Sequence, residues 1–170
     1  NVTTKNVYSV DGNGQHIAIL DFGIKANILR AFKSRGCKLT VFPAYTTAQE
    51  VLKVNPDKIF LSNGPGNPED YIEIIENIKN LIGKKPIIGI CLGHQLLAIA
   101  LGGKTEKLKF GHRGCNHPVK DLRKNKINIT SQNHGYYVKE LPKGVIPTHI
   151  SLNDGTVEGM KHQSLPLYSI

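Results

Sequence analysis

The sequence predicts an α/β protein whose doubly wound, mostly parallel sheet is flanked by helices, with extra β-structure in the C-terminal half. Between residues 16 and 101, short apolar runs of buried-strand type alternate with segments of helical spacing. From Lys104 onward the pattern changes to extended pieces separated by turns. The chain has 170 residues, and 39% of them are hydrophobic, which is enough for one ordinary core. We therefore expect residues 1–170 to form a single domain.

In the first half, strands and helices take turns along the chain. A capping box of Thr47 and Glu50 opens the second helix, and Pro56 ends it. The last helix of this half is apolar on nearly every face, so we expect it to be buried centrally. The predicted strands cover residues 16–22, 38–44, 57–62 and 85–91. The predicted helices cover residues 24–35, 47–55, 71–82 and 92–101.

The second half and the two ends read differently. Residues 1–14 are polar and linker-like, and the chain begins without methionine. The apolar run 165–170 stops without a turn signal, so we expect both ends to continue in a longer protein. The short strands predicted after the last helix cover residues 107–110, 126–130, 136–138, 148–152, 156–160 and 167–170.

Composition limits the classes of partner. The formal charge is 22 basic minus 13 acidic residues, or +9, but the densest basic stretch, 120–126, contains Asp and Asn, as solvated turns do. Aromatic residues make up only 6% and do not interleave with the basic ones, which argues against a nucleic-acid partner. We read the charge as solvated surface or as contact with an acidic partner protein. Three scattered cysteines and the lack of a long apolar run predict a cytoplasmic protein without a membrane segment.

The strongest chemical signal is Cys91. The segment Gly89-Ile90-Cys91-Leu92-Gly93 has the glycine spacing of a nucleophile elbow, a sharp strand-to-helix turn that exposes its middle side chain. At a helix N-terminus, the dipole and free N–H groups are expected to lower the thiol pKa toward neutrality. The N–H of Leu92 would face a developing oxyanion, and the glycine-rich loop 63–66 would supply a second donor. The alternative is that Cys91 is simply a small core residue.

The other candidate groups are weaker. Cys37 begins a strand and is most simply a core residue. The cluster of His and Cys in 112–117 matches no common zinc spacing, and its Gly and Pro predict a turn, so we expect no metal. His134 is either a catalytic base or a polar loop residue. The segment 11–14 lacks the helix and lysine of a phosphate loop and is read as a turn.

Five segments, 21–28, 62–68, 89–95, 110–118 and 131–136, together give the chain a resemblance to a known family. It resembles the class I glutamine amidotransferase (glutaminase) domain, in the version found in the small subunit of carbamoyl phosphate synthetase. The resemblance covers essentially the whole chain. Segments 62–68 and 89–95 resemble the amidotransferase class, and the other three resemble the carbamoyl phosphate synthetase branch.

The resemblance implies a role for each matching residue. Cys91 would attack the side-chain amide of L-glutamine, and the N–H groups of Leu92 and Gly64 would form the oxyanion hole. The chain itself would need no cofactor. Ammonia would pass to an ATP- and Mg-dependent large subunit that makes carbamoyl phosphate for pyrimidines and arginine. The residues implied in glutamine binding are Gly64, Gly66, Leu92, Gln95, Asn133, Gly135 and Tyr136.

The sequence also departs from the family. The His and Glu of the triad belong to a His-Pro-Glu segment expected a few residues beyond Ile170, and the family's N-terminal small-subunit domain is missing as well. We therefore expect these 170 residues alone to show negligible glutaminase turnover, since a general base is commonly worth about 10² to 10⁴ in rate.

Three alternative functions stay open. The chain could serve another synthetase as its amidotransferase domain, although segments 21–28 and 110–118 weigh against that. It could be a catalytically silent scaffold that regulates an ammonia-using synthetase, although Cys91 weighs against that. It could also be a cysteine hydrolase on the same elbow, which would not need Gln95 and Asn133 to hold a free amino acid.

Overall fold

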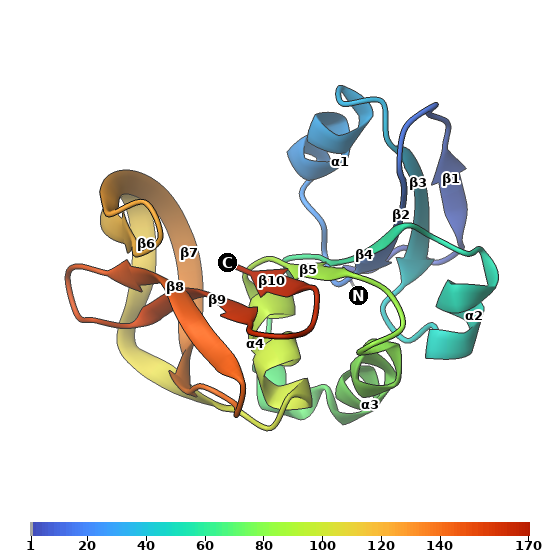
Figure 1. The fold of residues 1–170 in the computed structure, drawn as a ribbon. Coiled ribbons are helices and arrows are strands. Elements are labelled where there is room, and N and C mark those ends of the chain that lie inside the picture. Colours follow the sequence, from blue (N-terminus) through green and yellow to red (C-terminus); the bar gives the residue numbers. More distant parts are fainter. Residues whose placement is uncertain (1) are drawn as a thin grey trace.

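The computed structural model describes residues 2–170, and their strands form one continuous sheet (Figure 1). Across the sheet the order is β1-β3-β2-β4-β5-β10-β9-β7-β6-β8. The strands are β1 (Tyr8–Val10), β2 (His16–Asp21), β3 (Lys38–Pro43), β4 (Lys58–Leu61), β5 (Ile87–Gly89), β6 (Lys104–Asp121), β7 (Lys126–Glu140), β8 (Val145–Ser151), β9 (Val157–His162) and β10 (Leu167–Ser169). The helices are α1 (Ala26–Lys33), α2 (Ala48–Lys53), the 3-10 turn η1 (Pro68–Asp70), α3 (Ile72–Leu81) and α4 (Leu92–Ala100).

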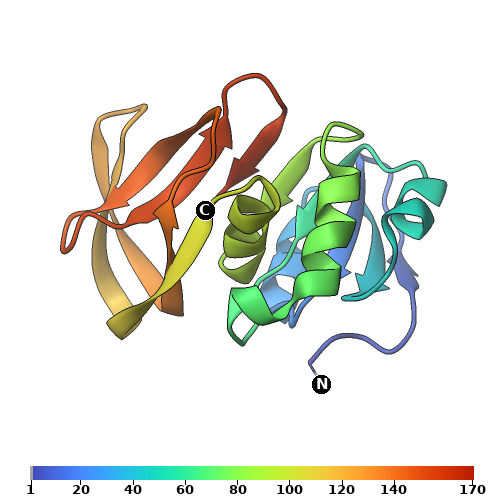
Figure 2. The same cartoon turned by 90° about the horizontal axis from the view of Figure 1, so that it is seen from below.

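Helices cover both faces of the N-terminal half of the sheet, as the alternating pattern predicts. Here β3, β2, β4, β5 and β10 pair in parallel. The apolar side chains of α1 pack on one face, against residues of β2 and β3 such as Ile19 and Val41. The residues Ile78 of α3 and Leu96 of α4 belong to the larger cluster on the other face, where Figure 2 shows the two helices side by side. The carboxyl ends of the parallel strands therefore lie together at one edge, where α/β proteins bind ligands.

The C-terminal half is antiparallel, which corrects part of the predicted fold class. The α/β class and the extra β-structure are confirmed, but the sheet as a whole has four parallel and six antiparallel pairings among the described residues, so "mostly parallel" is wrong. Strands β6 and β7 form a long hairpin, and β8 and β9 pair with it and with each other. Strand β10 joins the halves, pairing in parallel with β5 and antiparallel with β9.

The predicted turn at residues 112–117 is wrong: these residues lie inside β6. The glycines that suggested a turn bend the strand instead. Gly111 and Gly114 have φ of 72° and 132°, and the pairing with β7 shifts register on each side of the residue pair His112 and His134. Bulges of this kind let one long strand carry Gly without ending.

Two smaller features were not predicted. Residues Tyr8–Val10, placed in the linker-like lead-in, form β1 and pair with the edge of β3. The turn η1 lies in the segment between β4 and α3.

The capping box of Thr47 and Glu50 is confirmed by both of its hydrogen bonds, and α4 is buried along most of its length. Among residues 2–170, none of the helices is both long and apolar enough to cross a membrane.

Candidate active site

Cys91 stands at a strained turn between β5 and α4, as the glycine spacing predicts. Its φ of 52° lies in the left-handed region, which side chains rarely adopt, and its N–H donates to the carbonyl of Ile170 at 2.9 Å. A Cβ on Gly93 would lie 2.2 Å from the Leu61 carbonyl oxygen, and one on Gly89 would lie 2.8 Å from the Gly93 oxygen. Both glycines are thus required because the backbones of β4, β5 and α4 approach closely at the elbow.

The loop after β4 lies against the same turn. A Cβ on Gly64 would lie 2.2 Å from the Phe22 carbonyl oxygen, so Gly64 allows the close approach of two loops. Gly66 has φ of 100°, and the Tyr71 hydroxyl donates to the neighbouring Pro65 carbonyl at 2.9 Å. The loop is therefore held in place by its glycines and by one side-chain bond.

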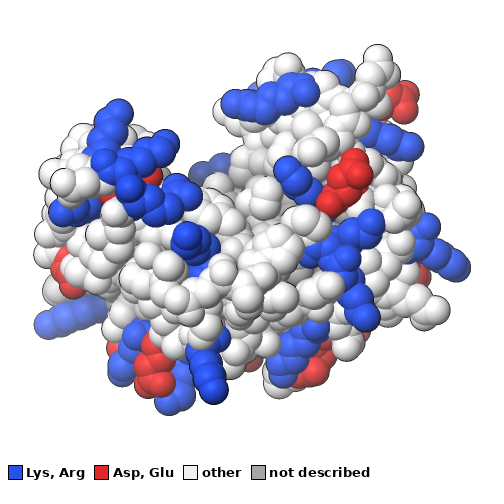
Figure 3. Space-filling model, in the orientation of Figure 1, with Lys and Arg blue, Asp and Glu red and all other residues white. Residues whose placement is uncertain are grey.

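The loop, the elbow and the β6–β7 hairpin enclose a cleft of about 860 Å³. Figure 3 shows the hollow between the two halves of the molecule, with Lys and Arg side chains on both sides of it. The side chain of Leu92 is buried in the core, and its backbone N–H acts to lower the pKa of the Cys91 thiol. The nucleophile and the other residues that the resemblance implies in glutamine binding all line the cleft: Gly64, Gly66, Cys91, Gln95, Asn133, Gly135 and Tyr136.

Gln95 connects the helix to the hairpin across the cleft floor. It lies one turn after Cys91 on α4 and is only 5% exposed. Its amide nitrogen donates to the carbonyl of Tyr136 on β7 at 2.8 Å. Because that bond joins the two halves, Gln95 fixes the spacing between the elbow and one wall of the cleft.

The predicted fall in the Cys91 pKa is wrong for the described residues. Burial raises the pKa of the thiol, since a buried thiolate loses hydration. The Leu92 N–H and the charge of Lys25 lower the pKa, but the charge of Glu158 raises it, and the net direction is upward. The favourable helix N-terminus is real, but burial outweighs it.

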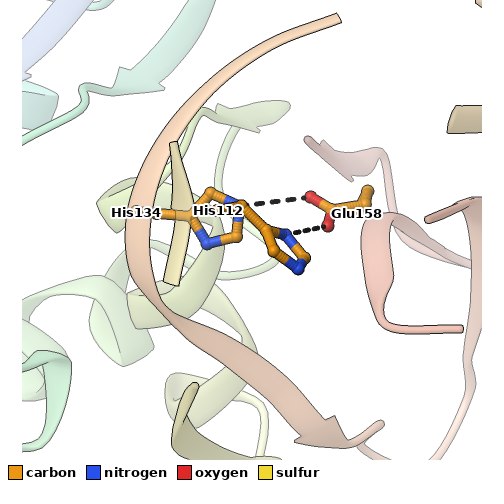
Figure 4. A group of neighbouring side chains, drawn as sticks. All are labelled: His112, His134 and Glu158. Carbon is orange, nitrogen blue, oxygen red and sulfur yellow. Dashed lines mark hydrogen bonds and ion pairs between the residues drawn. The ribbon is translucent and has the colours of Figure 1, made fainter. Parts of the chain in front are cut away.

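Sequence reasoning missed a polar cluster on the wall of the cleft. His112 of β6, His134 of β7 and Glu158 of β9 point toward one another (Figure 4). The His112 Nδ1 lies 3.0 Å from Glu158 Oε1, and the His134 Nε2 lies 3.5 Å from Glu158 Oε2. Asp154 accepts at the other side of His112, 2.7 Å from Nε2. His134 lies within β7, so the predicted loop position of this residue is wrong.

The charges of this cluster support one another. Burial lowers the pKa of His134, but hydrogen bonding to Glu158 and its charge outweigh that effect and raise it. Burial raises the pKa of Glu158, but the bond and charge of His134 outweigh it and lower the pKa. Hydrogen bonds from Thr156 and His112 overcome burial at Asp154 and lower its pKa to about 2. Glu158 carried no sequence signal, because only the antiparallel pairing brings β9 to the histidines.

His94 is a second residue that the sequence left without a clear role. It is 5% exposed, and its Nδ1 lies 2.8 Å from the Ser169 hydroxyl of β10. Burial lowers the pKa of His94 to about 4, so the ring is neutral at ordinary pH. Within the described part of the chain its Nε2 has no hydrogen-bond partner. A neutral buried ring with a bond to β10 holds α4 against the sheet.

Fold and site together define an α/β protein that presents a thiol at a strained strand-to-helix elbow beside a ligand-sized cleft. Residues 18–170 match the family model described as glutamine amidotransferase class-I. The chain belongs to this family.

Named relatives agree with the family. The chain is 63% identical over 169 residues to the carbamoyl phosphate synthase small chain of Clostridium perfringens, covering 99% of this chain and 48% of the relative. It is 52% identical over 170 residues to the carbamoyl phosphate synthase pyrimidine-specific small chain of Bacillus subtilis, covering 99% of this chain and 47% of the relative. The chain therefore spans about half the length of these relatives.

Solved structures share the fold. A putative GMP synthase protein from Thermoplasma acidophilum has a TM-score of 0.78 at 22% identity, over 91% of this chain and 81% of that one. A glutamine amidotransferase from Thermotoga maritima has a TM-score of 0.68 at 18% identity, over 91% of this chain and 73% of that one. At such identities the likeness concerns the fold alone.

Proposed function

We propose that this chain is the glutamine-hydrolysing part of a glutamine-dependent carbamoyl phosphate synthase. It would release ammonia from the side-chain amide of L-glutamine through a thioester on Cys91. The observation that carries this proposal is the strained cysteine elbow that faces a cleft lined by the residues that the family resemblance assigns to glutamine. The assignment to carbamoyl phosphate synthase in particular is supported by the names of relatives at 52–63% identity.

The chemistry follows from the positions of the groups. The Cys91 sulfur would attack the amide carbon while a base takes its proton, which the raised pKa of the thiol makes necessary. The N–H groups of Leu92 and Gly64 would stabilise the tetrahedral oxyanion. The C–N bond then breaks, and the nitrogen takes a proton and leaves as ammonia. Water adds to the thioester, and glutamate leaves as the thiol is restored.

The end of β10 lies beside the thiol, where a base could act on it. Ile170 lines the cleft, and its carbonyl accepts the Cys91 N–H at 2.9 Å. A His-Pro-Glu segment continuing from Ile170 would therefore start beside the thiol. Of the histidines present here, His94 is poorly suited to the role, because its low pKa leaves it a weak base.

Glutamine would be held by the walls of the cleft. Gln95 and Asn133 offer amide groups to the α-amino and α-carboxylate groups of the substrate, and the backbone of Gly66 and Gly135 approaches it without side chains. Tyr136 would form an aromatic wall. In a full-length small chain, we expect Gln95→Ala to raise the KM for glutamine much more than it slows alkylation of Cys91 by iodoacetamide, because iodoacetamide has no amino-acid groups for the cleft to bind.

The partner in this proposal is the ATP-dependent large subunit. ATP and Mg would act there, and this chain would need no cofactor of its own. The formal charge of +9 suits an acidic partner surface, and the product would supply pyrimidine and arginine synthesis in the cytoplasm.

A glutamine-like electrophile tests the proposal directly. A chloroketone analogue of glutamine should label the protein once, at Cys91, and L-glutamine should protect against it. Cys115→Ser is the matched control, because Cys115 is exposed and its loss should leave labelling unchanged. Labelling that persists in Cys91→Ser would refute the role of this thiol. A complete lack of labelling would favour the silent scaffold.

The synthase itself needs a second experiment. Mixed with the large subunit, a full-length small chain that contains these residues should form a complex that makes carbamoyl phosphate from glutamine. Cys91→Ser should abolish synthesis from glutamine and leave synthesis from added ammonia intact. Capture of a different synthetase would identify the chain as the amidotransferase of another pathway.

A further inference from the structure

The cluster on the cleft wall has too many hydrogen-bond acceptors for neutral histidines. Around His112, Asp154 Oδ2 lies 2.7 Å from Nε2 and Glu158 Oε1 lies 3.0 Å from Nδ1. Carboxylates accept hydrogen bonds and do not donate them, whereas a neutral imidazole carries only one N–H. In a neutral ring, one nitrogen of His112 would therefore point its lone pair at a carboxylate oxygen. A proton or a cation between the two atoms would remove this repulsion.

His134 repeats the same arrangement. Its Nδ1 lies 2.8 Å from the Tyr136 carbonyl oxygen, which requires the ring proton at Nδ1. Its Nε2 then faces Glu158 Oε2 at 3.5 Å and Gln132 Oε1 at 3.0 Å. Hence each ring has its outer nitrogen fixed by an acceptor, and its inner nitrogen faces Glu158.

Two kinds of positive charge satisfy this arrangement. A second proton on each ring would create two imidazolium ions whose ring centroids are 4.9 Å apart, with the carboxylates of Asp154 and Glu158 balancing their charge. A single divalent cation between the two inner nitrogens and Glu158 would satisfy both rings at once and avoid that repulsion. The outer contacts to Asp154 and to the Tyr136 carbonyl are those that orient metal-bound histidines in known sites.

We propose that His112, His134 and Glu158 form a binding site for a divalent transition-metal ion of the zinc class on the wall of the cleft. Two imidazoles and one carboxylate suit Zn²⁺, Co²⁺ or Ni²⁺, whereas Mg²⁺ and Ca²⁺ prefer oxygen ligands alone. The ligand atoms lie within 4.8 Å of one another.

The spacing is near that required by such an ion. Tetrahedral bonds of about 2.0 to 2.1 Å place ligand atoms about 3.3 Å apart. The two histidines lie 3.0 and 3.5 Å from different oxygens of Glu158, and the three ligand atoms together lie within 4.8 Å, so a bound ion would draw them closer together. His134 and Glu158 line the cleft, whereas His112 lies behind them and is 6% exposed. Three protein ligands with one side toward the cleft leave the remaining position to water or to an anionic ligand.

Cobalt titration of the full-length protein tests the site. After treatment with a chelator, the protein should bind one Co²⁺ per chain at this site, with the visible absorption bands of a four- or five-coordinate ion, and Zn²⁺ should displace it. We expect Glu158→Gln and His112→Asn each to weaken binding by more than about 100-fold. Asp154→Asn removes an outer contact and should weaken it by about 10- to 100-fold. His16→Asn, on β2 and outside the cluster, is the matched control and should bind like the parent.

Thiol binding must be separated from this site. A Cys91→Ser variant should retain the cobalt spectrum, and the parent should lack the near-ultraviolet charge-transfer band of cobalt–thiolate bonds. If a ligand variant fails to fold, paramagnetic shifts of the His112 and His134 ring signals in the parent decide the assignment. The proposal is overturned by absence of saturable binding, by equal binding in His112→Asn and the parent, or by ring signals that show two protonated imidazoles and no response to metal.

Discussion

His94 should make the folded protein less stable as the solution is acidified below about pH 6.5. Burial lowers its pKa from 6.5 to about 4, so between these values the unfolded chain binds a proton that the folded chain does not. The unfolded state is therefore stabilised relative to the folded state as the pH falls. The full effect below the folded pKa is about 3 kcal/mol, at about 1.4 kcal/mol per pKa unit, and the part between pH 7 and pH 5 is about 2 kcal/mol.

Urea unfolding at pH 7 and at pH 5 measures this effect when the parent is compared with His94→Asn. Asparagine can keep the bond to Ser169 but has no ring to protonate. The variant is expected to lose about 2 kcal/mol less than the parent between the two pH values, whatever its stability at pH 7. Other titrating groups are common to both proteins and cancel in the difference. Equal losses in the two proteins would show that His94 is not a buried neutral ring.

Three further predictions concern the elbow, the second helix and the thiol. Gly93→Ala should lower the free energy of unfolding in urea by about 3 kcal/mol or more and abolish labelling of Cys91, because the new Cβ would lie 2.2 Å from a backbone oxygen of β4. The control, Gly83→Ala, has a φ of 79° but open space around the new Cβ, so it should lower that free energy by only about 1 to 2 kcal/mol. Equal losses in the two variants would argue against the close approach at Gly93. Thr47→Ala removes the N-cap of α2 and should lower stability by about 1 kcal/mol, measured as a shift of the thermal midpoint; an unchanged midpoint would mean that the cap is not formed. In a Cys115→Ser background, alkylation of Cys91 by iodoacetamide should still accelerate at pH 9.0, the ordinary thiol pKa, because burial raises its pKa. A plateau near neutral pH would contradict the raised pKa of this thiol.

The N-terminal half of the fold was predictable because its signals are local. Each strand of the parallel half is a short apolar run, and each helix has a regular apolar face with a cap or a glycine at its end. The hairpin of β6 and β7 was not predictable in the same way. Gly111 and Gly114 are turn signals in sequence, but long-range pairing with β7 makes them bulges.

The candidate site likewise has parts with local sequence signals and parts that depend on long-range packing. Cys91 and the loop around Gly64 could be found from glycine spacing, since close backbone approach leaves a mark in the sequence. The environment of the thiol could not, because its burial depends on how the second half of the chain packs across the cleft. The meeting of His134 with Glu158 likewise depends on the pairing of β7 and β9, which no spacing encodes.

The three residues of β10 have a mechanical consequence. Within the sheet, this strand is the backbone link between the half that carries the elbow and the half that carries the hairpin, beside the side-chain bond from Gln95 to Tyr136, and its Ser169 also contacts His94. A motion that widens the cleft must therefore bend or break this short strand pairing, together with the bond from Gln95 to Tyr136. Exchange of the amide hydrogens of Leu167–Ser169 with solvent is therefore a direct gauge of how often the two walls separate, and a ligand that bridges them should slow it.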